Sequence, residues 1–429
     1  MRRIRVILVL IVLCGVPQSG SAGTAETREG PFVIHRIAID PQNLEIVYAA
    51  TSNYGILATR DAGTTWALIN RGLGSYTHHA LAIDPSDPNI LYVGAWGGGV
   101  SRSEDRGMHW TDRNRGLGNT AIEDLALDSV HPKTVYVATT SGVFKSEDEG
   151  AGWIFYGEGL PVARIQIFER LIALPSGPIE LLLGTSGGLF KRERNASRWE
   201  AVDGIVKEEH ITAFALEPKT GMLYMGTVNN GMLRSRDGGE TWAPSGGGLK
   251  NIWISDIALD PLHPGIVYAA TRGKGVLKSK DGGVTWKQTN NGLPVQDIRS
   301  LVMAPEGSNI LYAGTTSQGL IKTTDGGKRW RVMKGYPELS IAEIVASLSP
   351  KVERPDRTPA PSVPGEFFKC NRCHGWVDPF LNSKNTYWRV PPNQRDWGLT
   401  VARMSQRARL TPEDSRKIID FLTQYTMRK

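Results

Sequence analysis

Two cysteines and a histidine near the C-terminus carry the clearest chemical pattern in this sequence. Cys370 and Cys373 are separated by two residues, and His374 follows at once. Thiols at this spacing can add across the vinyl groups of a haem, and the adjacent imidazole can then ligate its iron. The motif therefore predicts one covalently attached haem c. The alternative, half of a zinc site, would require a second Cys/His pair at ligand spacing, and none follows.

The second axial ligand of such an iron can be narrowed by elimination. His374 is the only histidine in the C-terminal segment, which leaves Met404 and Met427 as candidates. Met427 lies two residues from the C-terminus, whereas Met404 precedes a predicted final helix that begins with a capping box at Thr411. Residues 397–422 resemble small monohaem cytochrome c domains, including those paired with periplasmic sulfite dehydrogenases. The resemblance implies that Met404 is the distal ligand, and His/Met ligation favours electron transfer over oxygen chemistry.

The first 22 residues predict an exported protein. Arginines near Met1 precede an apolar run from Val6 to Leu13, and small residues follow up to Ala22. This order is typical of a cleaved secretory signal peptide, and the apolar run is too short to span a bilayer. We therefore expect a periplasmic or secreted protein, with an uncleaved anchor as the alternative. Because Cys14 lies in this leader, only the two cysteines of the haem motif would remain.

Positive charge is concentrated at the C-terminal end. Residues 351–429 contain 15 basic and 8 acidic residues, and their net charge of +7 equals that of the whole chain. A basic protein can bind nucleic acid, but the predicted export and the haem motif argue against it. We expect an acidic redox partner protein instead, steered by this charge. This partner could belong to a membrane-associated redox complex. A merely solvated basic surface is the alternative.

A repeat of seven units fills the first three quarters of the chain. Tryptophans recur at intervals of 44, 43, 46, 43, 44 and 44 residues, at Trp66, Trp110, Trp153, Trp199, Trp242, Trp286 and Trp330. Six of them end the pattern Ser/Thr-x-Asp-x-Gly-x-x-Trp, whereas the fourth unit has Arg194 and Ala196 in place of Asp and Gly. Each unit contains four short strand-like runs separated by turn residues, which predicts a propeller blade. The altered fourth turn is expected to be the least ordered of the seven.

The pattern resembles the Asp-box (BNR) repeat of sialidases, sortilin-type receptors and photosystem II assembly factors. The resemblance covers about residues 33–335. It implies a seven-bladed all-β propeller whose boxes are structural, with the aspartate accepting backbone N–H groups and the tryptophan packing between blades. The way in which the ring closes stays open, because residues 340–349 could complete the first blade, add an outer strand or form a short helix.

The predicted fold class is therefore a multidomain chain with a β-propeller followed by a small all-α cytochrome c domain. Its divisions are a signal peptide over 1–22, the propeller over 33–349, a proline-rich linker over 350–364 and the cytochrome domain over 365–429. The predicted function is single-electron transfer, with the propeller as a protein-docking module.

Two other functions stay open at this stage. The propeller could hold the substrate site of a dehydrogenase or hydrolase with haem as electron outlet, or the chain could assist assembly of a redox complex. A dehydrogenase would need a metal or cofactor site, and the propeller histidines show no convergent ligand set in the sequence. A glycosidase would need a pair of carboxylates in a pocket.

Overall fold

The computed structural model describes residues 33–52, 54–161, 168–305 and 309–337. All of them belong to one of the two units into which the chain divides, Pro31–Pro350. The predicted signal peptide, the linker and the haem-binding residues Cys370, Cys373, His374 and Met404 lie outside the described residues. The same is true of residues 340–349.

The described residues form seven antiparallel sheets of four strands each, and each sheet is built from consecutive strands of the chain. The first strand of each sheet packs against the first strands of the two neighbouring sheets, so the seven sheets surround a common axis as the blades of a propeller. The predicted seven-bladed propeller is thereby confirmed.

Strands at the same place in successive blades have similar lengths. The first, innermost strands are β1 (Ile34–Ile39), β5 (His78–Ile83), β9 (Ile122–Leu127), β13 (Phe168–Ala173), β17 (Ile211–Leu216), β21 (Ile254–Leu259) and β25 (Ile298–Met303). The second strands are β2 (Val47–Thr51), β6 (Leu91–Ala95), β10 (Val135–Thr139), β14 (Ile179–Thr185), β18 (Leu223–Thr227), β22 (Val267–Thr271) and β26 (Leu311–Thr315).

The outer half of each blade is shorter. The third strands are β3 (Ile56–Thr59), β7 (Gly99–Ser103), β11 (Gly142–Ser146), β15 (Gly188–Glu193), β19 (Met232–Ser235), β23 (Val276–Ser279) and β27 (Leu320–Thr323). The fourth strands are β4 (Ala67–Leu68), β8 (Thr111–Asp112), β12 (Ile154–Phe155), β16 (Glu200–Ala201), β20 (Ala243–Pro244), β24 (Lys287–Gln288) and β28 (Arg331–Val332). One 3₁₀ turn, η1 (Gly204–Val206), follows the fourth blade.

Continuous apolar runs in the sequence became the second strands. Every residue of β2, β6 and β10 is buried, because these strands lie inside a sheet whose two faces are both covered by neighbouring blades. Six second strands carry a buried tyrosine at one equivalent position: Tyr48, Tyr92, Tyr136, Tyr224, Tyr268 and Tyr312. The fourth blade has Leu182 at this position.

The Asp boxes are the turns between third and fourth strands, as predicted. In the first box, the Thr59 hydroxyl donates to Asp61 (2.7 Å), and the Thr65 amide donates to the same carboxylate (2.9 Å). The Thr65 hydroxyl also donates to Asp61 (2.6 Å). This bond has the largest effect, and together the three bonds hold the pKa of Asp61 well below its usual range. The box aspartate is thus a structural acceptor.

The tryptophans join successive blades. The indole Nε1 of Trp110 donates to the backbone oxygen of Ile69 in the preceding blade (2.6 Å), and that of Trp153 donates to Arg113 (2.7 Å). Gly72 lies so close to Trp110 that a Cβ atom would come within 2.2 Å of the Trp110 backbone oxygen. This contact explains why each unit ends in a glycine-containing loop.

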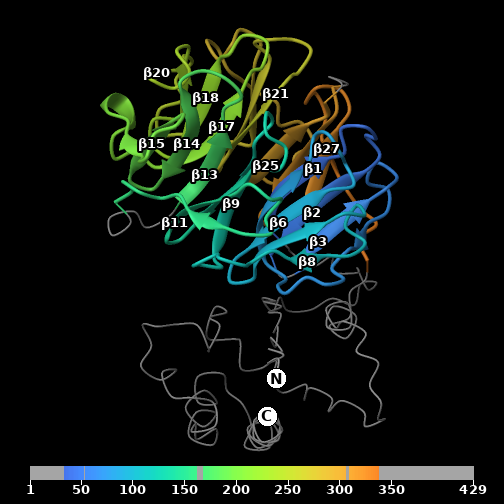
Figure 1. Cartoon of the computed structure of the whole chain (residues 1–429). Coiled ribbons are helices and arrows are strands. Elements are labelled where there is room, and N and C mark those ends of the chain that lie inside the picture. Colours follow the sequence, from blue (N-terminus) through green and yellow to red (C-terminus); the bar gives the residue numbers. More distant parts are fainter. Residues whose placement is uncertain (1–32, 53, 162–167, 306–308, 338–429) are drawn as a thin grey trace, which may run out of the picture. The chain divides into compact units, whose positions relative to one another are not determined.

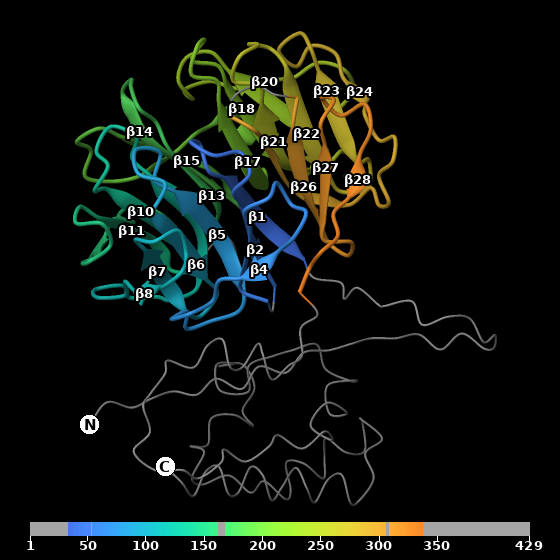
Figure 2. The ribbon, with the colours of Figure 1, turned by 90° about the vertical axis from the view of Figure 1, so that its right-hand side faces the viewer.

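The ring closes by packing of the seventh blade on the first. The orange strands of the last blade lie beside the blue strands of the first in both views (Figures 1 and 2). Tyr312 and Lys322 both donate to the backbone oxygen of Ala62 (3.1 and 2.9 Å), and the Trp66 amide donates to Gly335 (2.9 Å). The first blade has all four strands from its own consecutive residues, so it needs no strand from residues 340–349.

Within the described residues, no helix has the length and apolar character that a membrane crossing requires.

Candidate functional site

Two arginine–aspartate pairs cross the axis of the propeller. Arg36 on β1 contacts Asp124 on β9 (2.8 Å), and Arg170 on β13 contacts Asp256 on β21 (3.3 Å). Each arginine reaches past one intervening blade, whose equivalent residue is an alanine, Ala80 or Ala213. Because alanine leaves room, the long guanidinium side chains can span two blades.

Each of these aspartates also connects to the following blade. Asp124 accepts the backbone amide of Leu171 (3.0 Å), and Asp256 accepts that of Leu301 (2.9 Å). Burial raises the pKa of both carboxyl groups, although Arg36 opposes the rise. The two pairs form a polar network that ties blades 1, 3 and 4 together and blades 4, 6 and 7 together.

Two histidines lie close together at the positions directly before Arg36 and Ala80 on the first strands, namely His35 and His79. The rings of His35 and His79 lie with centroids 4.5 Å apart, and His79 Nδ1 lies 3.2 Å from the Glu123 carboxylate. His35 Nε2 contacts the Ser52 hydroxyl (2.6 Å). Burial, followed by the positive charge of Arg299, lowers the pKa of His35 far below its usual range, so this ring is neutral.

The proximity of His35 and His79 was not predicted from the sequence, in which the propeller histidines show no convergent set. Position in the repeat was the available signal, since His35 and His79 occupy the same place in adjacent blades. Among the described residues, no group of three or more His, Cys, Asp or Glu side chains is arranged to hold a metal ion.

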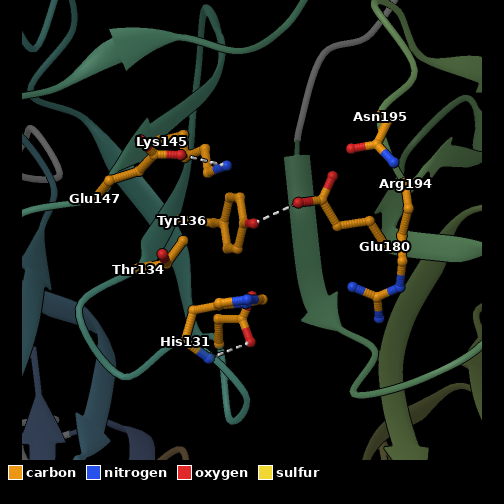
Figure 3. A pocket seen from close by; sticks show the side chains of 9 residues that line it. His131, Thr134, Tyr136, Lys145, Glu147, Glu180, Arg194 and Asn195 are labelled. Atoms are coloured by element: carbon orange, nitrogen blue, oxygen red, sulfur yellow. Dashed lines mark hydrogen bonds and ion pairs between the residues drawn. The ribbon is translucent and has the colours of Figure 1, made fainter.

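A polar pocket of about 400 Å³ lies between blades 3 and 4. Figure 3 shows Tyr136 on one wall facing Glu180 on the other, with Arg194 beside Glu180. The pocket is lined by Asp128, His131, Thr134, Tyr136, Lys145, Glu147, Glu180, Arg194 and Asn195. None of these residues was predicted as a site residue.

The pocket lies where the fourth blade lacks an Asp box. At three other junctions the second-strand tyrosine donates to a backbone oxygen in the next box, as Tyr268 does to Gly326 (3.1 Å). At this junction Tyr136 donates instead to Glu180 (2.7 Å). Arg194 turns away from the usual box position and donates to backbone oxygens of Leu174 and Gly177. The pocket is therefore lined by Arg194 and Asn195 from the altered box and by Glu180 from β14.

The pocket carboxylates each accept hydrogen bonds from neighbouring groups. Glu180 receives hydroxyl bonds from both Tyr136 and Tyr156 (2.7 and 2.9 Å). The Lys145 ammonium, bonded to Glu147 (2.8 Å), lowers the pKa of Glu147. Backbone amides and His131 lower the pKa of Asp128 against the opposing effect of burial. Glycoside hydrolysis needs one carboxyl group whose pKa is raised, whereas the pKa values of Asp128 and Glu147 in this pocket are lowered.

Fold and repeat together define this part of the chain as a seven-bladed Asp-box β-propeller. It is similar in structure to the GH74 xyloglucanase of Xanthomonas campestris, with a TM-score of 0.60 and 18% identity over 71% of this chain. The chain spans about half, 55%, of the length of that xyloglucanase chain.

Two further solved structures share the propeller fold. YCF48 bound to a D1 peptide matches with a TM-score of 0.53 and 17% identity, covering 68% of this chain and 93% of that one. PorZ, a surface component of the type-IX secretion system of Porphyromonas gingivalis, matches with a TM-score of 0.53 and 18% identity, covering 65% of this chain and 45% of that one. No protein-family profile matches the sequence. No curated protein matches it either.

Proposed function

We propose that this chain is an exported c-type cytochrome that transfers single electrons and uses its propeller to dock a partner protein. The observation that carries the proposal is the motif Cys370-Asn371-Arg372-Cys373-His374. Its two cysteines are the only ones outside the predicted signal peptide. One covalent haem is therefore the cofactor for which the sequence provides a complete attachment site.

The residues of the C-terminal segment have distinct roles in this proposal. Cys370 and Cys373 would hold the porphyrin through thioethers, while His374 and Met404 would ligate the iron. A haem held in this way accepts and donates one electron at a time. A filled sixth position excludes small ligands, which favours electron transfer over oxygen chemistry.

The propeller supplies a rigid body on which a partner can dock. Its seven sheets are joined through buried tyrosines, indole hydrogen bonds and the axial ion pairs, so little order has to be gained on binding. We propose an acidic redox protein as the partner and the periplasm, or the cell exterior, as the location. Attachment to a membrane-associated redox complex fits the same arrangement.

The alternatives receive unequal support. The lowered pKa values of Asp128 and Glu147 in the pocket between blades 3 and 4 weigh against a glycosidase at that place. An assembly factor for a redox complex stays the second candidate, because the propeller covers nearly the whole of YCF48, 93% of its length, at a TM-score of 0.53. This likeness concerns the fold alone.

Expression of the full chain with its leader in a host that attaches haem c tests the proposal. We expect haem that stays bound after denaturation, a reduced-haem absorbance band, and loss of both in Cys373→Ala. Met404→Ala should abolish the thioether-to-iron charge-transfer band and lower the reduction potential, whereas the matched variant Met427→Ala should change neither. A wild-type chain that is exported with its motif intact but carries no covalent haem would contradict the proposal.

A further inference from the structure

Six of the third strands carry a basic residue close to an Asp box, and the blades differ in whether an acidic residue pairs with it. In blades 2 to 4 a basic residue on this strand pairs with an acid two residues later. The pairs are Arg102 with Glu104, Lys145 with Glu147 (2.8 Å) and Lys191 with Glu193 (3.2 Å). In these blades each basic side chain is therefore paired with a carboxylate close to it in the sequence.

Blades 5 to 7 keep the basic residue and lose the acid. The basic residues are Arg234, Lys278 and Lys322, and the residues two positions later are Arg236, Lys280 and Thr324. Each basic group donates to a backbone oxygen in the box of the next blade: Arg234 to Gly282 (2.7 Å), Lys278 to Gly326 (3.0 Å) and Lys322 to Ala62 (2.9 Å). A carbonyl oxygen satisfies the hydrogen bond and leaves the positive charge uncompensated.

More basic residues stand beside these three. Lys280, Lys328 and Arg329 are exposed, and Lys328 and Arg329 belong to the box of blade 7. Burial lowers the pKa of Lys278, and the positive charges of Lys280 and Lys328 lower it further, against the opposing effects of Asp260 and Asp325. These groups therefore lie within electrostatic reach of one another. We call this surface the basic arc: Arg234, Arg236, Lys278, Lys280, Lys322, Lys328 and Arg329.

Few negative charges balance the basic arc. The acids of its boxes are Asp237, Asp281 and Asp325, each bonded to a hydroxyl group of its own turn, and Glu240, which pairs with Lys191 of blade 4 (2.7 Å). Over the propeller as a whole, residues 33–216 contain 16 basic and 22 acidic residues, a net charge of −6. Residues 217–337 contain 15 basic and 9 acidic residues, a net charge of +6. The positive charge is thus segregated to blades 5 to 7.

We propose that the basic arc is the docking surface for an acidic redox protein. The inference rests on the proposed function, because the partner is one that exchanges electrons with the haem. Charge complementarity selects this occupant: residues 351–429 carry a net charge of +7 and have the same sign as the arc. An acidic protein is therefore attracted by both.

Plant-type [2Fe–2S] ferredoxin serves as an acidic probe with a low reduction potential. Binding of ferredoxin to the full-length chain and the rate at which it reduces the haem are measured over a range of salt concentrations. The arc variant is Lys280→Gln/Lys328→Gln/Arg329→Gln. Its matched control, Arg115→Gln/Lys133→Gln/Arg198→Gln, removes three exposed basic residues from the loop before blade 3 and from blades 3 and 4.

We expect the arc variant to bind ferredoxin about tenfold more weakly at low salt and to lose most of the salt dependence, while the control changes by less than about twofold. Equal effects of the two variants, or none, would overturn the proposal. So would arc-dependent binding to vesicles of anionic phospholipid without arc-dependent binding to ferredoxin. Failure of haem attachment would remove only the reduction signal, and the binding measurement would still decide whether the arc is a docking surface.

Discussion

His78 departs from its repeat position in a way that should make the propeller sensitive to acid. The equivalent first-strand residues in five other blades are Ile34, Ile122, Ile211, Ile254 and Ile298, all buried. The His78 side chain is 1% exposed, and its Nδ1 atom has no hydrogen-bond partner among the described residues. Burial, with a smaller effect of His79, lowers its pKa to about 3 from 6.5.

His78→Ile is therefore expected to stabilise the propeller as the pH falls. The unfolded chain binds a proton at this residue below pH 6.5 and the folded chain does so only near pH 3, so native stability is lost on acidification through this window. The loss is about 1.4 kcal/mol per pH unit for one group. Urea unfolding at about pH 7.5 and about pH 5.5 should show the advantage of the variant growing by about 1 kcal/mol. An advantage that does not change with pH would contradict this account.

Much of the residue-level detail could be predicted from the repeat alone. The role of Asp61 as a local acceptor and the packing of Trp110 against the preceding blade follow from a pattern that occurs six times. The convergence of His35 with His79, and of Arg36 with Asp124, could not be predicted in the same way. Both contacts depend on side-chain rotamers, and the Arg36–Asp124 contact also depends on the small size of Ala80 in the blade between them, so no motif encodes them.

At the level of single elements, the fourth-blade turn shows how a lost motif is replaced. Arg194 stands where the other boxes have aspartate, and its guanidinium holds the preceding β13–β14 turn through the backbone oxygens of Leu174 and Gly177. The fold of the turn is kept: Trp199 still donates to the backbone oxygen of Tyr156 (2.6 Å). The expectation that this turn is the least ordered of the seven stays a prediction that amide exchange can check.

Arg194→Ala should loosen this turn and the one it holds. Loss of two hydrogen bonds from a charged, partly exposed donor is expected to cost about 1 kcal/mol, measured by urea unfolding. Amide exchange should quicken from residue 194 to residue 199 and around Gly177. The control Arg198→Ala removes an exposed arginine from the same turn and should cost less than about 0.5 kcal/mol. Equal costs for the two variants would show that the bonds of Arg194 add no stability.

For the molecule as a whole, the junction between blades 7 and 1 uses the same contacts as an internal junction. Tyr312 and Lys322 donate to Ala62, just as Tyr268 and Lys278 donate to Gly326. The sequence could not decide how the ring closes, because the first and last repeats look alike and residues 340–349 resemble a further first strand. Packing of complete blades made such a strand unnecessary within the described residues.

The double variant Tyr312→Phe/Lys322→Met tests whether the closing junction is a weak point. Removing both donors should cost about 1–3 kcal/mol, since each bond contributes about 0.5–1.5 kcal/mol. The matched variant Tyr268→Phe/Lys278→Met removes the same pair between blades 6 and 7. If the two junctions are equivalent, the two losses of unfolding free energy should agree within about 0.5 kcal/mol. A clearly larger loss at the closing junction would mark it as the place where the ring opens.

The completeness of every blade has a consequence for chain connectivity. When a ring is closed by a strand borrowed from the opposite end, its first and last residues are fixed by the fold. Here each blade is made from one continuous stretch, and neighbouring blades are held by side chains and carbonyl oxygens that do not depend on chain order. The propeller is therefore a natural candidate for circular permutation. New termini could be placed in the loop between any two blades, and the ring would still assemble from the same seven units.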